Sequence, residues 1–248
     1  MSSIHEKIRS AVDISQKAQR NYDLSKSVDS KDLETMIYAA TNSPSKQNET
    51  HYSLYVYTDK SIIKKIYKET KQFSVLGSKG DFDKVFQEQD GKFYQSKDHS
   101  VYNSQILSNI LFVFVEDHGT PRGGNSMIAQ QTTDPNTESV RIYEEQCNYS
   151  IGIAVGELIL SATLLGYKTG ICSAFPKNIV GRIINSEYDP KLLVGVGYEN
   201  VGIDRRLHAE VLNKNIVETR RTGELNEKWR FPSFKKHTKV FVNGNKNT

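Results

Sequence analysis

The sequence predicts an α+β fold, and three observations support this prediction. Residues 151–165 form an apolar segment of helical length with a single charged side chain, Glu157. Residues 106–115 form a largely apolar run, which is typical of a strand buried on both faces. Helices and strands are mixed along the chain without strict βαβ alternation, and this order favours α+β over a doubly wound α/β fold.

The apolar helix over 151–165 is expected to have no solvent-facing side. A helix that is apolar on nearly every face must lie inside the protein or between two subunits. This run contains Gly152 and Gly156 and is too short to cross a membrane, so no membrane association is expected. Gly166 supplies a helix stop, and residues 168–173 then read as a strand that ends in small side chains. Such a helix and strand either form ordinary core or seat a flat cofactor.

The remaining elements follow from apolar periodicity and from turn residues. The lysines of the helix predicted over 59–72 are expected to form a solvated outer face. Helices are predicted over residues 1–20, 30–41, 59–72 and 179–184, and strands over 53–58, 192–198 and 239–242.

We expect one domain over residues 1–248, with a lid-like insertion and a C-terminal extension. The insertion, about 73–104, is polar and irregular but contains aromatic side chains, which suggests a lid that folds over a ligand. A second loop, over 118–137, is rich in turn residues. The extension, about 212–248, is polar yet also contains aromatic side chains, so we expect it to pack along a partner subunit. The aromatic residues of these two segments include Phe82, Phe86, Phe93, Tyr94, Trp229, Phe231, Phe234 and Phe241.

Composition excludes several classes of protein. With 37% hydrophobic and 25% charged residues, the chain is typical of a soluble globular protein. Its net charge of +4 is too small for the basic stripe of a nucleic-acid-binding protein. The two cysteines, Cys147 and Cys172, form no CxxC motif, and no secretory signal precedes them. These features predict a cytoplasmic location and no disulfide framework.

Motifs for phosphate loops, metals and nucleophiles are absent. Neither GxGxxG nor GxxxxGK[ST] occurs, and the 6 histidines are scattered, so no metal site is expected. There is no GxSxG elbow, and Cys172 has no neighbouring base in the sequence. A buried structural thiol is therefore the simplest interpretation of each cysteine.

Four segments, taken in order, resemble the nitroreductase family of flavoproteins. Lys17-Ala18-Gln19-Arg20, followed by Tyr22, is similar to the family's Arg-Ser-x-Arg opening. Pro44-Ser45-Lys46-Gln47-Asn48, followed by Tyr52, is similar to its Pro-Ser-x-x-Asn motif. Residues 152–166 and 169–175 resemble its central helix and flavin-side strand. Gly195-Val196-Gly197-Tyr198, followed by Arg205-Arg206, resembles its Gly-Tyr turn and the basic residue beyond it.

The resemblance implies a nitroreductase-like architecture and a flavin activity. The fold would be a central, mostly antiparallel sheet flanked by helices, with the apolar helix buried at its centre. The protein would be a homodimer that binds FMN at its interface and takes hydride from NAD(P)H. It would pass the electrons to a small nitro-, quinone- or related acceptor in a ping-pong cycle. Because the flavin carries this reaction, we assign no catalytic acid or base.

The same resemblance implies the cofactor-binding residues. Lys17, Arg20 and Arg205 would bind the FMN phosphate, with Arg206 as an alternative, and Ala18 stands where the family has a serine. Asn48 would bind the pyrimidine edge of the flavin, with Ser45 close to the ring. Cys172, Ser173 and Ala174 would let a strand end approach the ring closely. The side chains expected to meet the acceptor are Tyr94, Tyr102 and Arg122.

Departures from the family pattern leave alternative functions open. Ala18 removes a hydroxyl donor, Lys17 replaces a bidentate arginine with a point charge, and Thr50-His51 stands where Gln-Pro is usual. Ser173-Ala174 stands where many relatives have two glycines. The chain could therefore be a flavin-binding protein of the same fold without turnover. A protein that binds polyanions through the lysines of residues 59–72 is a further alternative.

Overall fold

The computed structural model describes residues 3–70, 103–117, 137–203, 205, 240–242 and 245–247. Most of the expected lid, the loop over 118–136 and the expected extension from 212 to 239 lie outside the described residues. Arg206, Tyr94, Tyr102 and Arg122 also lie outside them.

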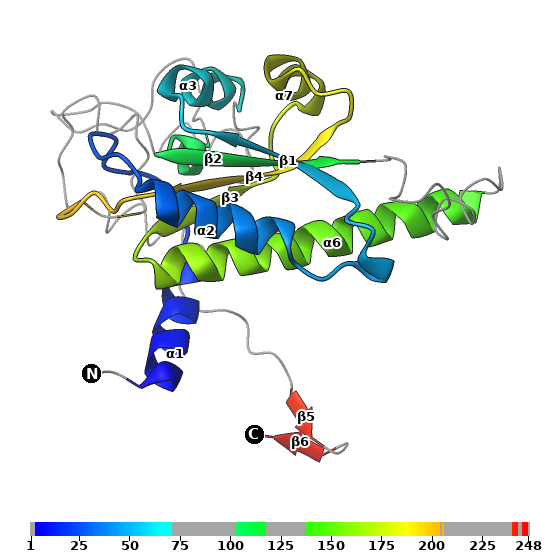
Figure 1. Cartoon of the computed structure of the whole chain (residues 1–248), viewed down its shortest axis with the longest axis horizontal. Helices are drawn as coiled ribbons and strands as arrows, with labels where there is room; N and C mark the ends of the chain where they lie inside the picture. The colour runs from blue at the N-terminus through cyan, green and yellow to red at the C-terminus, as the bar shows by residue number, and fades with distance from the viewer. Residues whose placement is uncertain are drawn as a thin grey trace, which may run out of the picture.

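The centre of the described structure is a four-stranded antiparallel sheet (Figure 1). Its strands are β1 (Tyr52–Tyr57), β2 (Ile110–Glu116), β3 (Lys168–Cys172) and β4 (Pro190–Gly197). The order across the sheet is β1-β2-β4-β3, so β1 and β3 form its two edges. The predicted α+β class and the antiparallel central sheet are therefore confirmed.

Strand β2 is buried on both faces, as its apolar sequence predicts. Successive side chains of a strand point to opposite faces of the sheet. Phe112 and Phe114 pack on one face against helices α2 (Ser30–Thr41) and α6 (Thr137–Leu164). Leu111 and Val113 pack on the other face against α3 (Lys60–Glu69) and α7 (Lys177–Ile184). The result is a three-layer arrangement with helices on both sides of the sheet (Figure 1).

The helix predicted over 151–165 is the C-terminal part of the much longer helix α6, which has 28 residues. The expectation that it is too short to cross a membrane is therefore wrong. Its segment Glu144–Leu164 is long and apolar enough to do so, but half of the apolar window is buried inside the protein. Side chains of α6 pack against α2 and the sheet, for example Leu158, which is fully buried. These contacts are those of a core helix.

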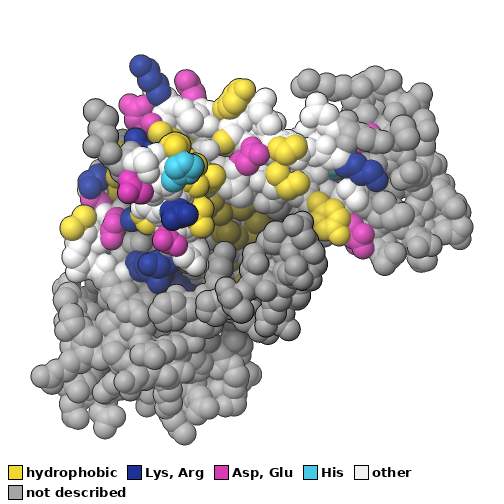
Figure 2. Space-filling view, turned by 90° about the horizontal axis from the view of Figure 1, so that it is seen from below, with side chains coloured by type: hydrophobic (Ala, Val, Ile, Leu, Met, Phe, Trp, Pro, Cys, Tyr) yellow, Lys and Arg dark blue, Asp and Glu magenta, His cyan; other side chains and the backbone are white. Residues whose placement is uncertain are grey.

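One side of α6 is exposed in the single chain, so of the two predicted positions, inside the protein or between two subunits, the second stays a prediction for this side. The exposed fractions are 58% for Tyr149, 43% for Ile153 and 50% for Leu164. Gly152 and Gly156 lie on the same side, and apart from the helix's own backbone no heavy atom of the described residues lies within 4 Å of a Cβ placed on either glycine. We call these five residues the α6 stripe. Figure 2 views the molecule from the side on which α6 lies and shows exposed hydrophobic side chains there.

The first helix is shorter than predicted. Helix α1 (Ile4–Ser15) begins at a capping box between Ser3 and Glu6 and packs against α6. The prediction of a helix over residues 1–20 is wrong at its C-terminal end. Residues after Gln16 leave the helix, and the N–H of Gln19 donates to the carbonyl of Thr169 in β3. The segment with the family's opening motif therefore lies along the edge strand of the sheet.

One other predicted boundary changes for a physical reason. The strand predicted over 106–115 begins only at Ile110, because Ser104–Ile106 forms a 3-10 helix. Gly195 and Gly197 lie inside β4, in agreement with the strand predicted over 192–198, and not in the turn that the family resemblance implies. A Cβ on Gly195 would stand 2.2 Å from the carbonyl oxygen of Gln105, so this glycine is needed for the close approach of residues 104–109. The short strand β5 (Val240–Val242), which pairs with β6 (Asn245–Asn247), agrees with the predicted last strand.

Candidate functional site

Arg20 and Arg205, far apart in the sequence, meet at one edge of the sheet. The backbone N–H of Arg20 donates a 2.9 Å hydrogen bond to the carbonyl of Arg205. In return, Nη1 of Arg205 donates a 2.9 Å hydrogen bond to the carbonyl of Ala18. Both arginines are half-buried. We call Ala18, Arg20 and Arg205 the guanidinium corner.

The two arginines interact electrostatically. Burial, and then the charge of Arg205, hold the pKa of the Arg20 guanidinium below its usual value. Both effects disfavour the charged form of Arg20, so placing two like charges here has a free-energy cost. An anion bound between the two guanidinium groups would offset their repulsion and favour the charged form of Arg20. The corner therefore has the charge and the donors that a phosphate requires.

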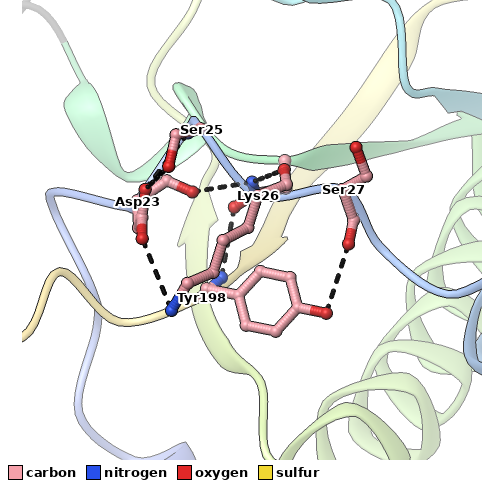
Figure 3. A network of polar contacts seen from close by, with 6 residues as sticks. Asp23, Ser25, Lys26, Ser27 and Tyr198 are labelled. Carbon is pink, nitrogen blue, oxygen red and sulfur yellow. Dashed lines mark hydrogen bonds and ion pairs between the residues drawn. The ribbon is translucent and has the colours of Figure 1, made fainter.

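A hydrogen-bond network holds the chain that leads away from the corner. The N–H of Asp23 donates to the carbonyl of Tyr198, and the side-chain amide of Asn109 donates to the carbonyls of Asp23 and Lys26. Nζ of Lys26 lies 3.4 Å from Oδ2 of Asp23 and 5.2 Å from the centre of the Tyr198 ring. Figure 3 shows the Lys26 side chain between these two residues. The hydroxyl of Tyr198 donates to the carbonyl of Ser27. Arg20 is thus anchored through the residues that follow it.

Lys17 is less closely connected with this corner. Its backbone N–H donates to the carbonyl of Ile14 at the end of α1, and its side chain is exposed. The described contacts join Ala18, Arg20 and Arg205 but do not include the ammonium group of Lys17.

The loop before β1 contains Ser45 and Asn48. The hydroxyl of Ser45 accepts a 2.9 Å hydrogen bond from the N–H of Thr50. Asn48 is exposed at the end of a 3-10 helix, Lys46–Asn48. The loop is therefore held by its own hydrogen bonds, and among the described residues no hydrogen bond of the Asn48 side-chain amide is found.

The three residues predicted to approach the flavin at the end of β3, Cys172, Ser173 and Ala174, differ in their exposure to solvent. Ser173 is exposed, whereas Cys172 is buried and burial raises the pKa of its thiol to about 11. The Cys172 side chain belongs to the core on the α3 and α7 side of the sheet, as the structural interpretation of this cysteine predicts. The carbonyl of Ala174 accepts a 2.8 Å hydrogen bond from the side-chain amide of Asn103. Only backbone groups of Cys172 could therefore approach a ligand.

The guanidinium corner and the loop that contains Asn48 lie at opposite corners of the sheet. They flank the two edge strands, β3 and β1, which are three strand spacings or about 14 Å apart. Thr169, beside the guanidinium corner, is aligned through Val196 with Ile110, the first residue of β2. Tyr52, beside the Asn48 loop, pairs with Glu116, the last residue of β2. A single chain therefore does not bring Arg20 and Asn48 together.

Sequence reasoning did not find the supporting role of residues 103–109. Asn103 and Asn109 are both buried, and their side chains hold the backbone on either side of the candidate site. The signal was visible: Ser108 and Asn109 interrupt the apolar run over 106–115. Buried amides need hydrogen-bond partners, so two polar residues within an apolar run indicate such a role.

The sheet, the central helix and the guanidinium corner define an α+β protein with paired cations at one edge of its sheet. The chain belongs to the nitroreductase family, whose model matches residues 15–198, and this places it among the flavin-dependent oxidoreductases. No curated protein is a significant match to the sequence.

Solved structures with the same fold come from several bacteria, at low sequence identity. The hypothetical oxidoreductase YcnD from Bacillus subtilis is 16% identical over 90% of this chain and 84% of its own, with a TM-score of 0.55. A candidate NAD(P)H:FMN oxidoreductase from Staphylococcus epidermidis is 14% identical over 86% of this chain and 94% of its own, with a TM-score of 0.53. A nitroreductase family protein from Streptococcus pneumoniae is 16% identical over 86% and 98%, with a TM-score of 0.52.

Proposed function

We propose that this protein is an FMN-dependent oxidoreductase that takes hydride from NAD(P)H and passes electrons to a small nitro-, quinone- or related acceptor. The observation that carries this proposal is the pairing of Arg20 with Arg205 in a member of a flavoprotein family. When bound, FMN would supply the redox chemistry by accepting hydride and then releasing the electrons to the acceptor.

The guanidinium corner would hold the FMN phosphate. A phosphate monoester has a charge of about −1.5 to −2 near neutral pH. Arg20 and Arg205 provide two cations whose mutual repulsion such an anion would relieve. The hydrogen bond from Arg205 to the Ala18 carbonyl fixes one guanidinium before the ligand arrives. This preorganisation favours binding, because less side-chain entropy is lost on association.

Each site would combine the guanidinium corner of one protomer with the Ser45–Asn48 loop of its partner. The proposal of a homodimer rests on the separation of these two groups within one chain and on the exposed α6 stripe. Two α6 stripes, each with two glycines that lack neighbours, could pack closely across a twofold axis. The loop of one protomer would then meet the corner of the other.

In the assembled site, the chain's own groups would position the ring and exclude water. Asn48 offers a donor and an acceptor for the pyrimidine edge. Backbone N–H groups after Cys172 would lie near the ring, while Asn103 fixes that strand end through the Ala174 carbonyl. Protons for the acceptor would come from solvent, since no described side chain is assigned this task.

A second candidate function is flavin binding without turnover. Ala18, which lacks the hydroxyl of the family serine, and Ser173-Ala174 in place of glycines favour this alternative. Purified protein that is yellow and is bleached by NADPH without oxygen, with recovery on addition of a quinone or nitro compound, supports the oxidoreductase. Yellow protein that NADPH and NADH both fail to bleach supports the flavin-binding alternative. Colourless protein that binds no added FMN contradicts both.

A further inference from the structure

The loop between Ser45 and β1 contains two residues with a left-handed backbone, of which Thr50 is strained. Asn48 has a φ of +58° and Thr50 a φ of +47°, both in the left-handed region, which asparagine tolerates but a β-branched residue such as threonine rarely adopts. Such conformations persist where surrounding contacts determine the backbone, and they are concentrated at functional sites. The structure must therefore contain groups that hold this loop.

The side chain of His51 connects the loop to the central helix. The imidazole is 3% exposed, and its Nδ1 lies 3.1 Å from the hydroxyl oxygen of Ser150 in α6. Its Nε2 lies 3.4 Å from a carboxylate oxygen of Glu49. The backbone of His51 is fixed separately, because its carbonyl accepts from the N–H of Asp117 and from the thiol of Cys147. The contacts of the imidazole with the loop and with α6 are therefore separate from those that fix the backbone of His51.

The chemistry of the partners defines the form of the imidazole. A carboxylate can only accept, and Nε2 lies 3.4 Å from that of Glu49 without the geometry of a hydrogen bond. These partners favour the tautomer in which Nε2 carries the proton and Nδ1 accepts from the Ser150 hydroxyl. Burial lowers the pKa of His51, opposed by Glu49 and assisted by Lys46, and this favours the neutral ring. The order Ser150–His51–Glu49 resembles that of a hydrolytic triad. However, Ser150 is only 2% exposed and cannot meet a substrate, so the arrangement is structural.

We propose that His51 is a positioning residue that holds the strained Asn48–Thr50 backbone against α6 and so fixes Asn48 for flavin binding. The two residues with a left-handed backbone alternate along the chain with the two residues of this contact chain: Asn48, Glu49, Thr50, His51. His51 stands where the family resemblance places proline, a residue whose ring restricts the backbone directly. In this protein the contacts of the His51 imidazole with Ser150 and Glu49 would restrict the backbone instead. The inference rests on the proposed function, because it assigns the loop a role at the flavin.

The test is a double-mutant cycle with full-length protein. His51→Phe keeps a ring but removes both nitrogens, and Asn48→Ala removes the group on which His51 is proposed to act. We expect His51→Phe to weaken FMN affinity about fivefold, as for the loss of one buried hydrogen bond. It should also shift the midpoint potential of bound FMN in the same direction as Asn48→Ala. In the Asn48→Ala background, His51→Phe should add little to either change, because the two residues act through one contact.

Two further variants and one measurement on the apoprotein keep the test decisive. Ser150→Ala should produce a smaller change of the same sign, and His51→Asn, which keeps a polar group near Nδ1, should recover part of the affinity. Amide hydrogen exchange at residues 48–50 should be faster in apo His51→Phe. Tyr167→Phe is the matched control, because it removes another buried hydroxyl contact, 2.7 Å from Asp32, and should leave these amides and the potential unchanged.

The outcomes separate this inference from the proposed function. Additive effects of His51→Phe and Asn48→Ala, or an unchanged potential in His51→Phe, would overturn the positioning role while FMN binding by the parent stands. If the parent binds no FMN, the proposed function fails. Exchange at residues 48–50 then decides whether His51 holds the loop. If His51→Phe does not fold, the cycle is run with Ser150→Ala and the same criteria apply.

Discussion

The side chain of Asn109 fills the space that a side chain at position 197 would need: its Oδ1 lies 2.1 Å from the point where a Cβ on Gly197 would stand. The same oxygen accepts a 3.1 Å hydrogen bond from the N–H of Tyr198, and the amide nitrogen holds the carbonyls of Asp23 and Lys26. Gly197 therefore permits the contact that attaches the chain after Arg20 to the sheet.

Gly197→Ala should destabilise the protein and loosen the guanidinium corner. The new methyl group must displace Asn109, and overpacking of this kind costs about 1–3 kcal/mol. Chemical denaturation would measure the free energy of unfolding, and FMN titration would measure the effect on the corner. Gly181→Ala is the control, because its Cβ would make only ordinary contacts, the nearest at 3.5 Å. Equal stability of the Gly197→Ala variant and the parent would contradict this account of Asn109.

Arg205→Ala should weaken FMN binding by about 1.5–3 kcal/mol, the range for a hydrogen bond to a charged group. Riboflavin, which lacks the phosphate, should bind the variant and the parent equally. Arg182→Ala, which removes an exposed arginine of α7, is the control for net charge. If FMN and riboflavin lose the same affinity, Arg205 does not act on the phosphate.

Gly156→Leu should disturb subunit association more than folding of the chain. Within one chain, no described atom outside the backbone of α6 lies within 4 Å of a Cβ at Gly156, so a larger residue has room. Across a closely packed interface of two α6 stripes, the leucine would separate the helices. Analytical ultracentrifugation would measure the dissociation constant of the dimer. Lys64→Leu, at an exposed position of α3, is the control. Unchanged association and flavin content would argue against the α6 stripe as the interface.

The stability of the apoprotein should fall as the pH is lowered through the range in which His51 titrates. The folded-state pKa of His51 lies below its usual value of 6.5, with burial as the largest cause. The folded state therefore binds fewer protons than the unfolded state below about pH 6.5. The contribution of neutral His51 is present above that pH and is lost as the pH falls toward the lowered pKa. Urea denaturation at several pH values between about 5 and 8, the range in which histidine usually titrates, would measure the free energy of unfolding. This free energy should change less with pH in His51→Phe than in the parent. Parallel profiles would contradict the buried, neutral ring.

The elements that could be predicted from the sequence are those with strong apolar patterns. The apolar run around Phe112 predicts β2, and the apolar residues at 158 and 162 predict the core side of α6. The end of α1 at Ser15 could not be predicted, because the chain leaves the helix to bond with Thr169, a long-range contact that local propensity does not encode. The exposed α6 stripe could not be predicted either, because apolar residues do not distinguish a core from an interface.

The candidate site was predicted in its parts but not in its arrangement. The pairing of Arg20 with Arg205 agrees with the expectation that both serve one phosphate, although their binding of FMN stays a prediction. The separation of Asn48 from that corner depends on strand order, which the sequence alone does not provide. The buried contact of His51 with Ser150 joins elements far apart in the chain, so neither residue could be singled out from sequence patterns.

The central claim is that each flavin site takes its guanidinium corner from one protomer and Asn48 from the other. It is tested most directly by FMN titration of two differently tagged heterodimers, with homodimers of each single variant as controls. In the first, one protomer has Arg205→Ala and the other Asn48→Ala. We predict one site of parental affinity, because one corner and one loop remain intact opposite each other. In the second, one protomer has both substitutions and its partner none, and we predict no site of parental affinity. The reverse result, with the parental site in the second heterodimer only, would contradict the account.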